Sequence, residues 1–113
     1  IESVNDLNQM IQSGKALEAF EKYYDENCIM QENDSEPRVG KGVNREFEKS
    51  FVNNVTEWRK ADIVNIGLSD NVSMVHWDFD FTHKEWGKRT YSQVSIQTWK
   101  DGKIIHEKFV YGS

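Results

Sequence analysis

The sequence predicts an α+β fold in which N-terminal helices pack on a strongly curved, mainly antiparallel sheet. Apolar residues recur at helical spacing in the first half of the chain. From Thr56 onward, apolar and polar residues alternate instead, as they do in strands that are covered on one face. Helices followed by a run of strands are typical of α+β proteins. The length of 113 residues suits one domain with its own core, which we place over residues 1–113.

Two short helices are expected before residue 25. Ser3 and Asp6 have the spacing of a capping box and mark the start of the first helix. Ser13 and Gly14 interrupt the pattern, and a second helical run covers residues 15–24. The apolar stripe of the first helix consists of Val4, Leu7, Met10 and Ile11.

A short strand, a loop and a third helix are expected next. Residues 28–32 have the composition of a strand, and residues 33–40, with the only proline of the chain, form a loop. A helix from residue 43 to about residue 52 carries Phe47 and Phe51 four positions apart, so that both rings lie on one side of it.

Four strands are expected in the remainder, over residues 57–68, 72–83, 90–99 and 103–111. Successive side chains of a strand point to opposite faces, so the second of these strands has one aromatic and one acidic face. Its apolar set is Val75, Trp77, Phe79 and Phe81, and its polar set is His76, Asp78, Asp80 and Thr82.

The turn at Asp101 and Gly102 decides which residues of the last two strands share a face. It can close as a two-residue turn or as a three-residue loop with Gly102 in a left-handed conformation, and the choice shifts the register by one residue. Amphipathicity alone favours the two-residue turn, but the sequence leaves both open. The two-residue turn groups Val94 and Ile96 with Ile105, Phe109 and Tyr111. The three-residue loop groups Gln93, Gln97 and Trp99 with Glu107, Phe109 and Tyr111.

Charge and cysteine content narrow the function classes. The net charge is −5 and no cluster of Lys and Arg is present, which argues against nucleic acid as a partner. Cys28 is the only cysteine, so neither an intrachain disulfide nor a thiolate metal site is expected. No apolar run approaches the length that spans a bilayer, and no signal peptide is visible, so we expect no membrane partner and a cytoplasmic location.

The order of elements resembles the nuclear transport factor 2-like superfamily of cone-shaped domains over nearly the whole chain. The resemblance rests on residues 16–27 leading into a strand, on Gly40-Lys-Gly42 opening a helix, and on the ending at residues 102–111. Within the superfamily, Phe79-Asp-Phe-Thr82 and Gly87-Lys-Arg89 are most similar to the SnoaL-like branch, which is related to polyketide cyclases. One fold of this kind hosts many functions.

The resemblance implies a pocket between the helices and the concave sheet face, and dimers that pair through the other face. It favours the three-residue hairpin and places the polar face of the sheet inside. The apolar set with Trp77, Phe79 and Phe81 would then be the homodimer surface. The concave set is expected to be His76, Asp78, Asp80, Gln93, Gln97, Trp99, Glu107, Phe109 and Tyr111, with Tyr24 as a further pocket residue.

Carboxylates crowded in a cavity suit general acid–base chemistry, because mutual repulsion and lost hydration raise a pKa toward neutrality. We expect Asp80 or Glu32 as the base, with Glu107 or Asp78 as its protonated partner. The resemblance places Glu32 where ketosteroid isomerase-like relatives carry their proton-abstracting aspartate. Leu7, however, stands where those enzymes carry an oxyanion-stabilising tyrosine.

These observations predict a protein with a polar pocket for a small organic ligand. The fitting reaction is a cofactor-independent isomerisation, cyclisation or dehydration. The alternatives are a non-catalytic ligand-binding or protein-interaction module, and an acidic face that is simply solvated. The sequence shows no cofactor fingerprint, and His76, His83 and His106 do not converge, so neither a cofactor nor a metal is expected.

Overall fold

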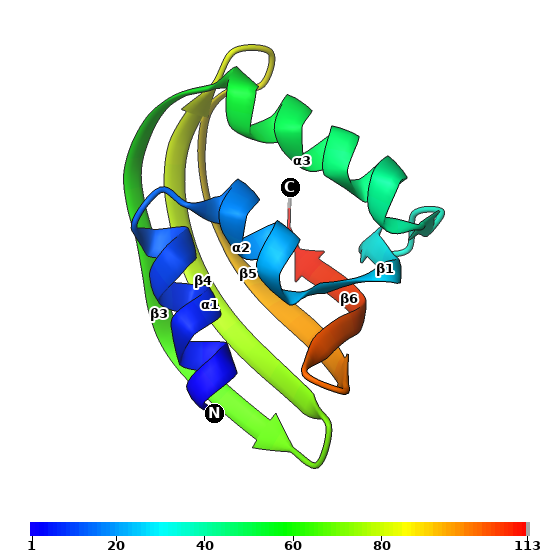
Figure 1. The fold of residues 1–113 in the computed structure, drawn as a ribbon. Helices are drawn as coiled ribbons and strands as arrows, with labels where there is room; N and C mark the ends of the chain where they lie inside the picture. The colour runs from blue at the N-terminus through cyan, green and yellow to red at the C-terminus, as the bar shows by residue number, and fades with distance from the viewer. Residues whose placement is uncertain (113) are drawn as a thin grey trace.

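Three helices pack on one curled six-stranded sheet in the computed structural model, which describes residues 1–112 (Figure 1). The predicted α+β class is confirmed. Of the predicted domain, only residue 113 lies outside the described residues. The elements are α1 (Glu2–Gln12), α2 (Ala16–Tyr23), β1 (Tyr24–Glu32), β2 (Arg38–Val39), α3 (Lys41–Asn54), β3 (Val55–Ser69), β4 (Val72–His83), β5 (Gly87–Lys100) and β6 (Lys103–Tyr111).

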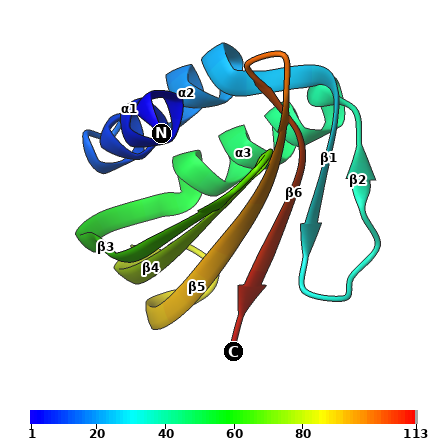
Figure 2. The ribbon, with the colours of Figure 1, turned by 90° about the horizontal axis from the view of Figure 1, so that it is seen from below.

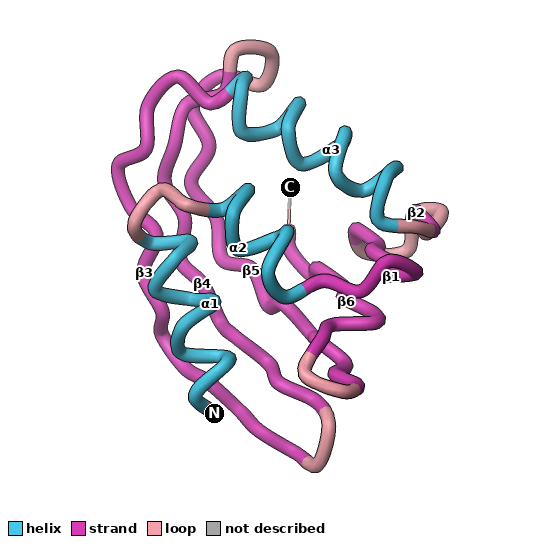
Figure 3. The backbone as a smooth tube through the Cα atoms, viewed as in Figure 1, coloured by secondary structure: helices cyan, strands magenta, loops and turns pink. Residues whose placement is uncertain are grey.

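The strands lie in the order β2-β1-β6-β5-β4-β3. The four strands β3 to β6 form an antiparallel meander, whereas β1 pairs in parallel with β6. All three helices lie on the same side of the sheet (Figures 2 and 3). The sheet therefore has one face covered by helices, which we call the concave face, and one outer face.

The start of α1 differs from the prediction. The helix begins one residue before Ser3, with Ile1 at its N-cap, and no side chain caps it, so the predicted capping box is wrong. Asp6 instead accepts hydrogen bonds from Lys22 Nζ at 2.8 Å and from the Tyr23 hydroxyl at 2.5 Å, both on α2. The bonds from Lys22 and Tyr23 lower the pKa of Asp6, and they join the first two helices.

The predicted loop between the first strand and the third helix contains a short strand. Within it, β2 pairs with β1, with Arg38 opposite Met30. Two residues are too few to show a strand pattern, so the sequence did not reveal it. Gly40 follows with a φ of 101°, a value that suits glycine, and α3 then begins at Lys41.

The hairpin between β5 and β6 combines features of both predicted alternatives. Asp101 and Gly102 have φ values of 53° and 79°, as a two-residue type I′ turn requires, and Lys100 lies opposite Lys103. The turn itself is therefore the two-residue form.

A β-bulge next to this turn then shifts the register by one residue. Trp99 pairs with Ile104, but Thr98 pairs with His106, so one residue of β6 has no partner. Beyond the bulge Gln97 lies opposite Glu107, which gives the same grouping of faces that the three-residue loop would have produced. Gln97 and Glu107 therefore share a face.

The aromatic side of β4 belongs to this same face. Trp77 pairs with Gln93, and Phe79 pairs with Tyr91. Trp77 is 2% exposed and Phe81 is 0% exposed. The aromatic set thus lies on the concave face, under the helices, and the prediction that placed it on an outer dimer surface is wrong. Alternation identifies which residues share a face, but burial of the apolar helices decides which face is covered.

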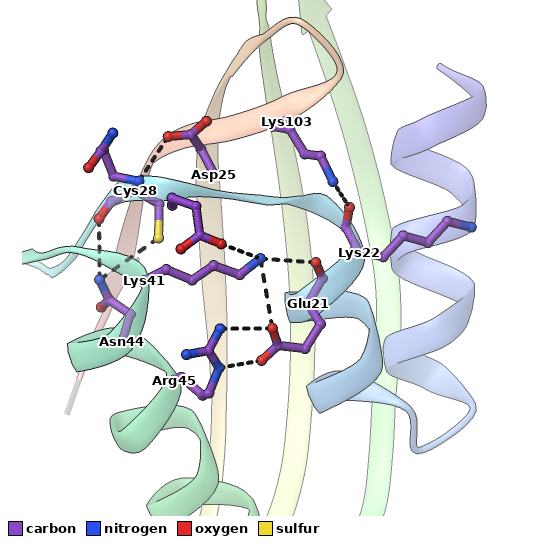
Figure 4. A network of polar contacts seen from close by, with 10 residues as sticks. Glu21, Lys22, Asp25, Cys28, Lys41, Asn44, Arg45 and Lys103 are labelled. Carbon is purple, nitrogen blue, oxygen red and sulfur yellow. Dashed lines mark hydrogen bonds and ion pairs between the residues drawn. The ribbon is translucent and has the colours of Figure 1, made fainter.

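A network of polar contacts holds α3 against α2 and β1 (Figure 4). The buried ammonium of Lys41 donates to the backbone oxygen of Glu21 at 3.0 Å and lies 3.8 Å from the carboxylate of Glu21. Arg45 donates to both carboxylate oxygens of Glu21, at 2.6 and 2.9 Å. Asn44 extends the network to β1 by donating to the Cys28 oxygen.

Lys41→Ala is expected to lower the free energy of unfolding by about 2 kcal/mol, because a buried hydrogen bond from a charged donor is lost. The measurement is urea unfolding. Lys49→Ala is the matched control on the same helix, since Lys49 is 52% exposed and lies 3.8 Å from Glu46. Equal losses in the two variants would contradict a structural role for the Lys41 contacts.

Candidate functional site

A cavity of about 510 Å³ lies between the helices and the concave face of the sheet. This volume lies in the range of small-molecule sites. Most of its lining is apolar or aromatic, so the predicted polar character of the pocket is wrong as a general description. The rings that line it include Phe20, Phe47 and Phe51 from the helices and Trp77, Phe81 and Tyr91 from the sheet.

Three carboxylates interrupt this apolar lining, and Glu107 on β6 is the most buried of them, at 2% exposure. The Tyr24 hydroxyl donates to its Oε1, and Gln97 Nε2 donates to its Oε2 at 2.9 Å. Burial raises the pKa of Glu107 to about 7, although both hydrogen bonds act in the opposite direction. Near neutral pH this carboxyl group is therefore able both to accept and to release a proton.

Glu48 on α3 is the second carboxylate of the lining. Its pKa is raised to about 8, chiefly by burial and in part by the neighbouring charges of Glu107 and Glu32. Glu48 is therefore mostly protonated at pH 7 and can donate a hydrogen bond. Two carboxyl groups whose environments set different pKa values are a common basis for acid–base roles.

Glu32 on β1 is the third carboxylate, and it is paired. Arg38 Nη1 donates to it at 2.5 Å. The Nε of Arg38 donates to Asn44 Oδ1 at 3.0 Å, and its guanidinium lies 3.7 Å from the ring centre of Phe47. Because Arg38 pairs with this carboxylate, Glu32 is a weaker candidate than Glu107 for the group that takes a proton from a ligand.

Seven of the residues predicted for the site line this cavity. They share the concave face or its edge, and most of them come from the register that the β-bulge restores. They are Tyr24, Glu32, Gln93, Gln97, Glu107, Phe109 and Tyr111.

The predicted placement of His76, Asp78 and Asp80 inside the pocket is wrong, because all three lie on the outer face of β4. Asp80 accepts hydrogen bonds from Arg59 Nε at 2.9 Å and from Thr90, and these bonds, chiefly that from Arg59, lower its pKa. Asp78 accepts from Ser92 at 2.6 Å and lies 3.9 Å from His76 Nε2. None of the three can act on a molecule in the cavity.

Trp99 also lies outside the cavity lining, although it is on the concave side of β5. Its ring packs edge-on against Tyr23, with 5.9 Å between the ring centres. Its indole nitrogen donates to Ser73 at 2.9 Å. Trp99 therefore lies next to the site but does not line it.

Glu48 is the functional candidate that the sequence interpretation missed. A signal was present, because Glu48 falls within the stripe of Asn44, Phe47 and Phe51 at helical spacing. A glutamate beside two phenylalanines on the covered side of a helix points to a carboxyl group at an apolar cavity.

Residues 1–112 contain neither a candidate cluster of metal ligands nor a candidate membrane-spanning helix. Within this range, no three His, Cys, Asp or Glu side chains are grouped so that they could hold a metal ion. No helix there is both long enough and apolar enough to cross a membrane.

Helices enclosed by a strongly curled sheet, with a cavity between them, define a cone-shaped domain of the nuclear transport factor 2-like type. A family model described as a SnoaL-like domain matches residues 2–111, and the chain belongs to this family. No curated protein shows significant sequence similarity to it.

Solved structures agree with this assignment. A protein of Mesorhizobium loti with the provisional name SnoaL-like polyketide cyclase is 24% identical, with a TM-score of 0.84 over 96% of this chain and 95% of that one. A protein of Jannaschia sp. CCS1 with the same provisional name is 10% identical, with a TM-score of 0.82 over 97% and 83% of the two chains. A provisionally named isomerase of Bacillus subtilis is 14% identical, with a TM-score of 0.72 over 98% and 84%. At these identities the likeness establishes the fold alone.

Proposed function

We propose that this protein binds a small, largely apolar organic molecule with a carbonyl group and catalyses cofactor-independent proton transfer on it. Isomerisation, cyclisation and dehydration are the reactions that such chemistry serves. The observation that carries the proposal is Glu107, a buried carboxyl group held by two donors at the wall of an aromatic cavity. The provisional names of the structural neighbours, a cyclase and an isomerase, support the same class.

Glu107 is the proposed base. Its pKa of about 7 lets the ionised form take a proton from the carbon next to a carbonyl group and return it at another position. Tyr24 and Gln97 fix the direction of the carboxylate by donating to its two oxygens. Glu107 is 2% exposed, so water screens the interactions of its carboxylate only weakly.

Glu48 is the proposed acid. With a pKa of about 8 it is protonated at neutral pH, and its hydroxyl group can donate to the carbonyl oxygen as negative charge develops there. This assignment replaces the predicted pair that used Asp80. Glu32 remains a pocket residue whose ion pair with Arg38 shapes the site.

The test is exchange of α-protons for deuterium in a panel of cyclic ketones, followed by proton NMR in deuterium oxide. The wild-type protein is expected to accelerate exchange. Glu107→Gln is expected to reduce the rate by about 100-fold or more, because the amide cannot accept the proton. Asp80→Asn, on the outer face of the same sheet, is the matched control and is expected to retain the rate.

Equal rates in wild type and Glu107→Gln would contradict the proposed base. Ketones that bind in the cavity with no accelerated exchange would instead support the non-catalytic binding module.

A further inference from the structure

A chain of three hydrogen bonds runs through the sheet and ends at Glu107. Trp99 Nε1 donates to Ser73 Oγ at 2.9 Å, and Ser73 Oγ donates to Gln97 Oε1 at 2.6 Å. Gln97 Nε2 then donates to Glu107 Oε2 at 2.9 Å. Ser73, Gln97 and Glu107 are 1%, 2% and 2% exposed, so water has little access to the last two bonds.

The direction of this chain follows from its first member. An indole nitrogen can donate a hydrogen bond but cannot accept one. Ser73 Oγ accepts this hydrogen bond and donates its own single hydrogen to the amide oxygen of Gln97; with the amide reversed, that hydrogen would lose this acceptor. The amide nitrogen of Gln97 must then face Glu107. Every bond in the chain is thus oriented so that Glu107 receives a hydrogen bond.

The opposite direction would favour the other protonation state of Glu107. If the Gln97 amide turned over, its oxygen would face the carboxyl group, and only a protonated Glu107 could donate to it. A donor beside a carboxyl group favours its ionised form, whereas an acceptor favours its neutral form. The orientation of one buried amide therefore selects the form of Glu107 that can act as a base.

We infer that Trp99 and Ser73 are positioning residues that hold the Gln97 amide as a donor to Glu107. The inference deepens the proposed function, on which its catalytic meaning rests, because Glu107 is the proposed base. Neither Trp99 nor Ser73 lines the main cavity. They act on the site only through Gln97.

The other groups around Glu107 lie outside this chain. Tyr24 donates to the second carboxylate oxygen and holds it independently of Gln97. The remaining titratable or charged groups that act on Glu107 or are acted on by it are Cys28 and Glu32 on β1, Arg38 on β2 and Glu48 on α3. Substituting Trp99 or Ser73 leaves all of these groups in place.

The far end of this hydrogen-bond chain, at Trp99 and Ser73, lies at a second, smaller depression of about 270 Å³ that both residues help to line. Leu68 and the turn between β3 and β4 form part of its wall, together with residues at the start of α1. The hydrogen-bond chain therefore extends from this depression to the main cavity. Changes at Trp99 can reach Glu107 without reshaping the cavity that surrounds it.

The experiment is titration of Glu107 by carbon NMR of protein with labelled glutamate carboxyl groups, with Glu107→Gln used to assign the signal. Trp99→Phe and Ser73→Ala are each expected to raise the titration midpoint of Glu107 by about one pH unit, since the amide is released and the ionised form loses its donor. Ser73→Thr retains the hydroxyl and is expected to keep the wild-type midpoint. The double variant Trp99→Phe/Ser73→Ala is expected to shift no further than either single variant, because both act through one path.

Purely structural roles would give a different result. Trp99→Phe and Ser73→Ala would then lower the unfolding temperature and leave the midpoint unchanged, and this outcome would overturn the inference. A shifted midpoint in a protein that exchanges no ketone protons would leave the inference standing and would contradict the proposed function. The titration needs no substrate, so the two failures are distinguishable.

Discussion

Raising the pH from 5 to 8 is expected to lower the free energy of unfolding, because Glu107 and Glu48 ionise inside the fold. Burial raises the pKa of Glu107 from 4.5 to about 7, so between these values the folded protein binds more protons than the unfolded chain. Stability then falls as the pH rises. The change in the pKa of Glu107 corresponds to about 3 kcal/mol, fully present below pH 4.5 and lost above pH 7.

Glu48 extends the same effect to higher pH. Its pKa rises from 4.5 to about 8, so its contribution is lost over a wider pH range, up to about pH 8. Part of this rise comes from the charge of Glu107, so the two contributions do not add in full. The combined loss is expected to exceed that of Glu107 alone and to fall short of the sum.

Other carboxylates act in a different pH range. Hydrogen bonds from Lys22, Arg45 and Arg59 lower the pKa values of Asp6, Glu21 and Asp80, respectively. Groups of this kind stabilise the fold above the unfolded pKa, and their contribution is lost as the pH falls through the folded value. Those losses occur below the ordinary values of 3.8 and 4.5, so the decline between pH 5 and 8 belongs to the buried pair.

Urea unfolding at pH 5, 6.5 and 8 measures this dependence. Glu107→Gln is expected to flatten the decline, since an amide does not ionise, and at pH 8 it is expected to be more stable than the wild type. Glu46→Gln, whose side chain is 75% exposed, is the control on α3. A wild-type stability that rises between pH 5 and 8 would contradict the raised pKa values.

The periodic patterns predicted most of the fold, because helices and strands differ in the spacing of their apolar residues. They could not decide which side of the sheet faces the helices. In β4 the alternation of Trp77 and Phe79 with Asp78 and Asp80 is equally regular in either orientation. The family resemblance favoured a polar interior, whereas the apolar helices cover the aromatic side.

The sequence allowed the residues of the site that share a sheet face to be grouped. It gave no signal for the parts of the site that depend on a β-bulge or on a very short strand. Grouping Gln97 with Glu107 required the correct face relation between β5 and β6, which the family resemblance favoured and amphipathicity alone did not. The bulge that produces this relation beside a two-residue turn has no sequence signal of its own. The pairing of Glu32 with Arg38 depends on the two-residue strand β2, which is too short to be recognised from a pattern.

The orientation of the sheet has a direct energetic consequence at neighbouring residues of β4. Phe81 is 0% exposed, and its ring lies 4.9 Å from that of Trp58 and 5.5 Å from that of Phe51, measured between ring centres. Phe81→Ala is expected to lower the free energy of unfolding by about 3–5 kcal/mol, through lost burial and an enlarged cavity. Asp80→Ala removes only a partly exposed ion pair with Arg59 and is expected to change the free energy of unfolding little.

Urea unfolding of both variants at pH 6 measures the contrast. An aromatic outer face and a polar interior would reverse it, because truncating an exposed Phe81 would cost little and removing a buried Asp80 would leave Arg59 unpaired. A large loss for Phe81→Ala, with Asp80→Ala near wild type, therefore requires the aromatic side of β4 to be the covered side. The aromatic residues on that side of β4 then belong both to the core and to the cavity lining. The same side chains therefore stabilise the fold and form the surface that contacts a ligand.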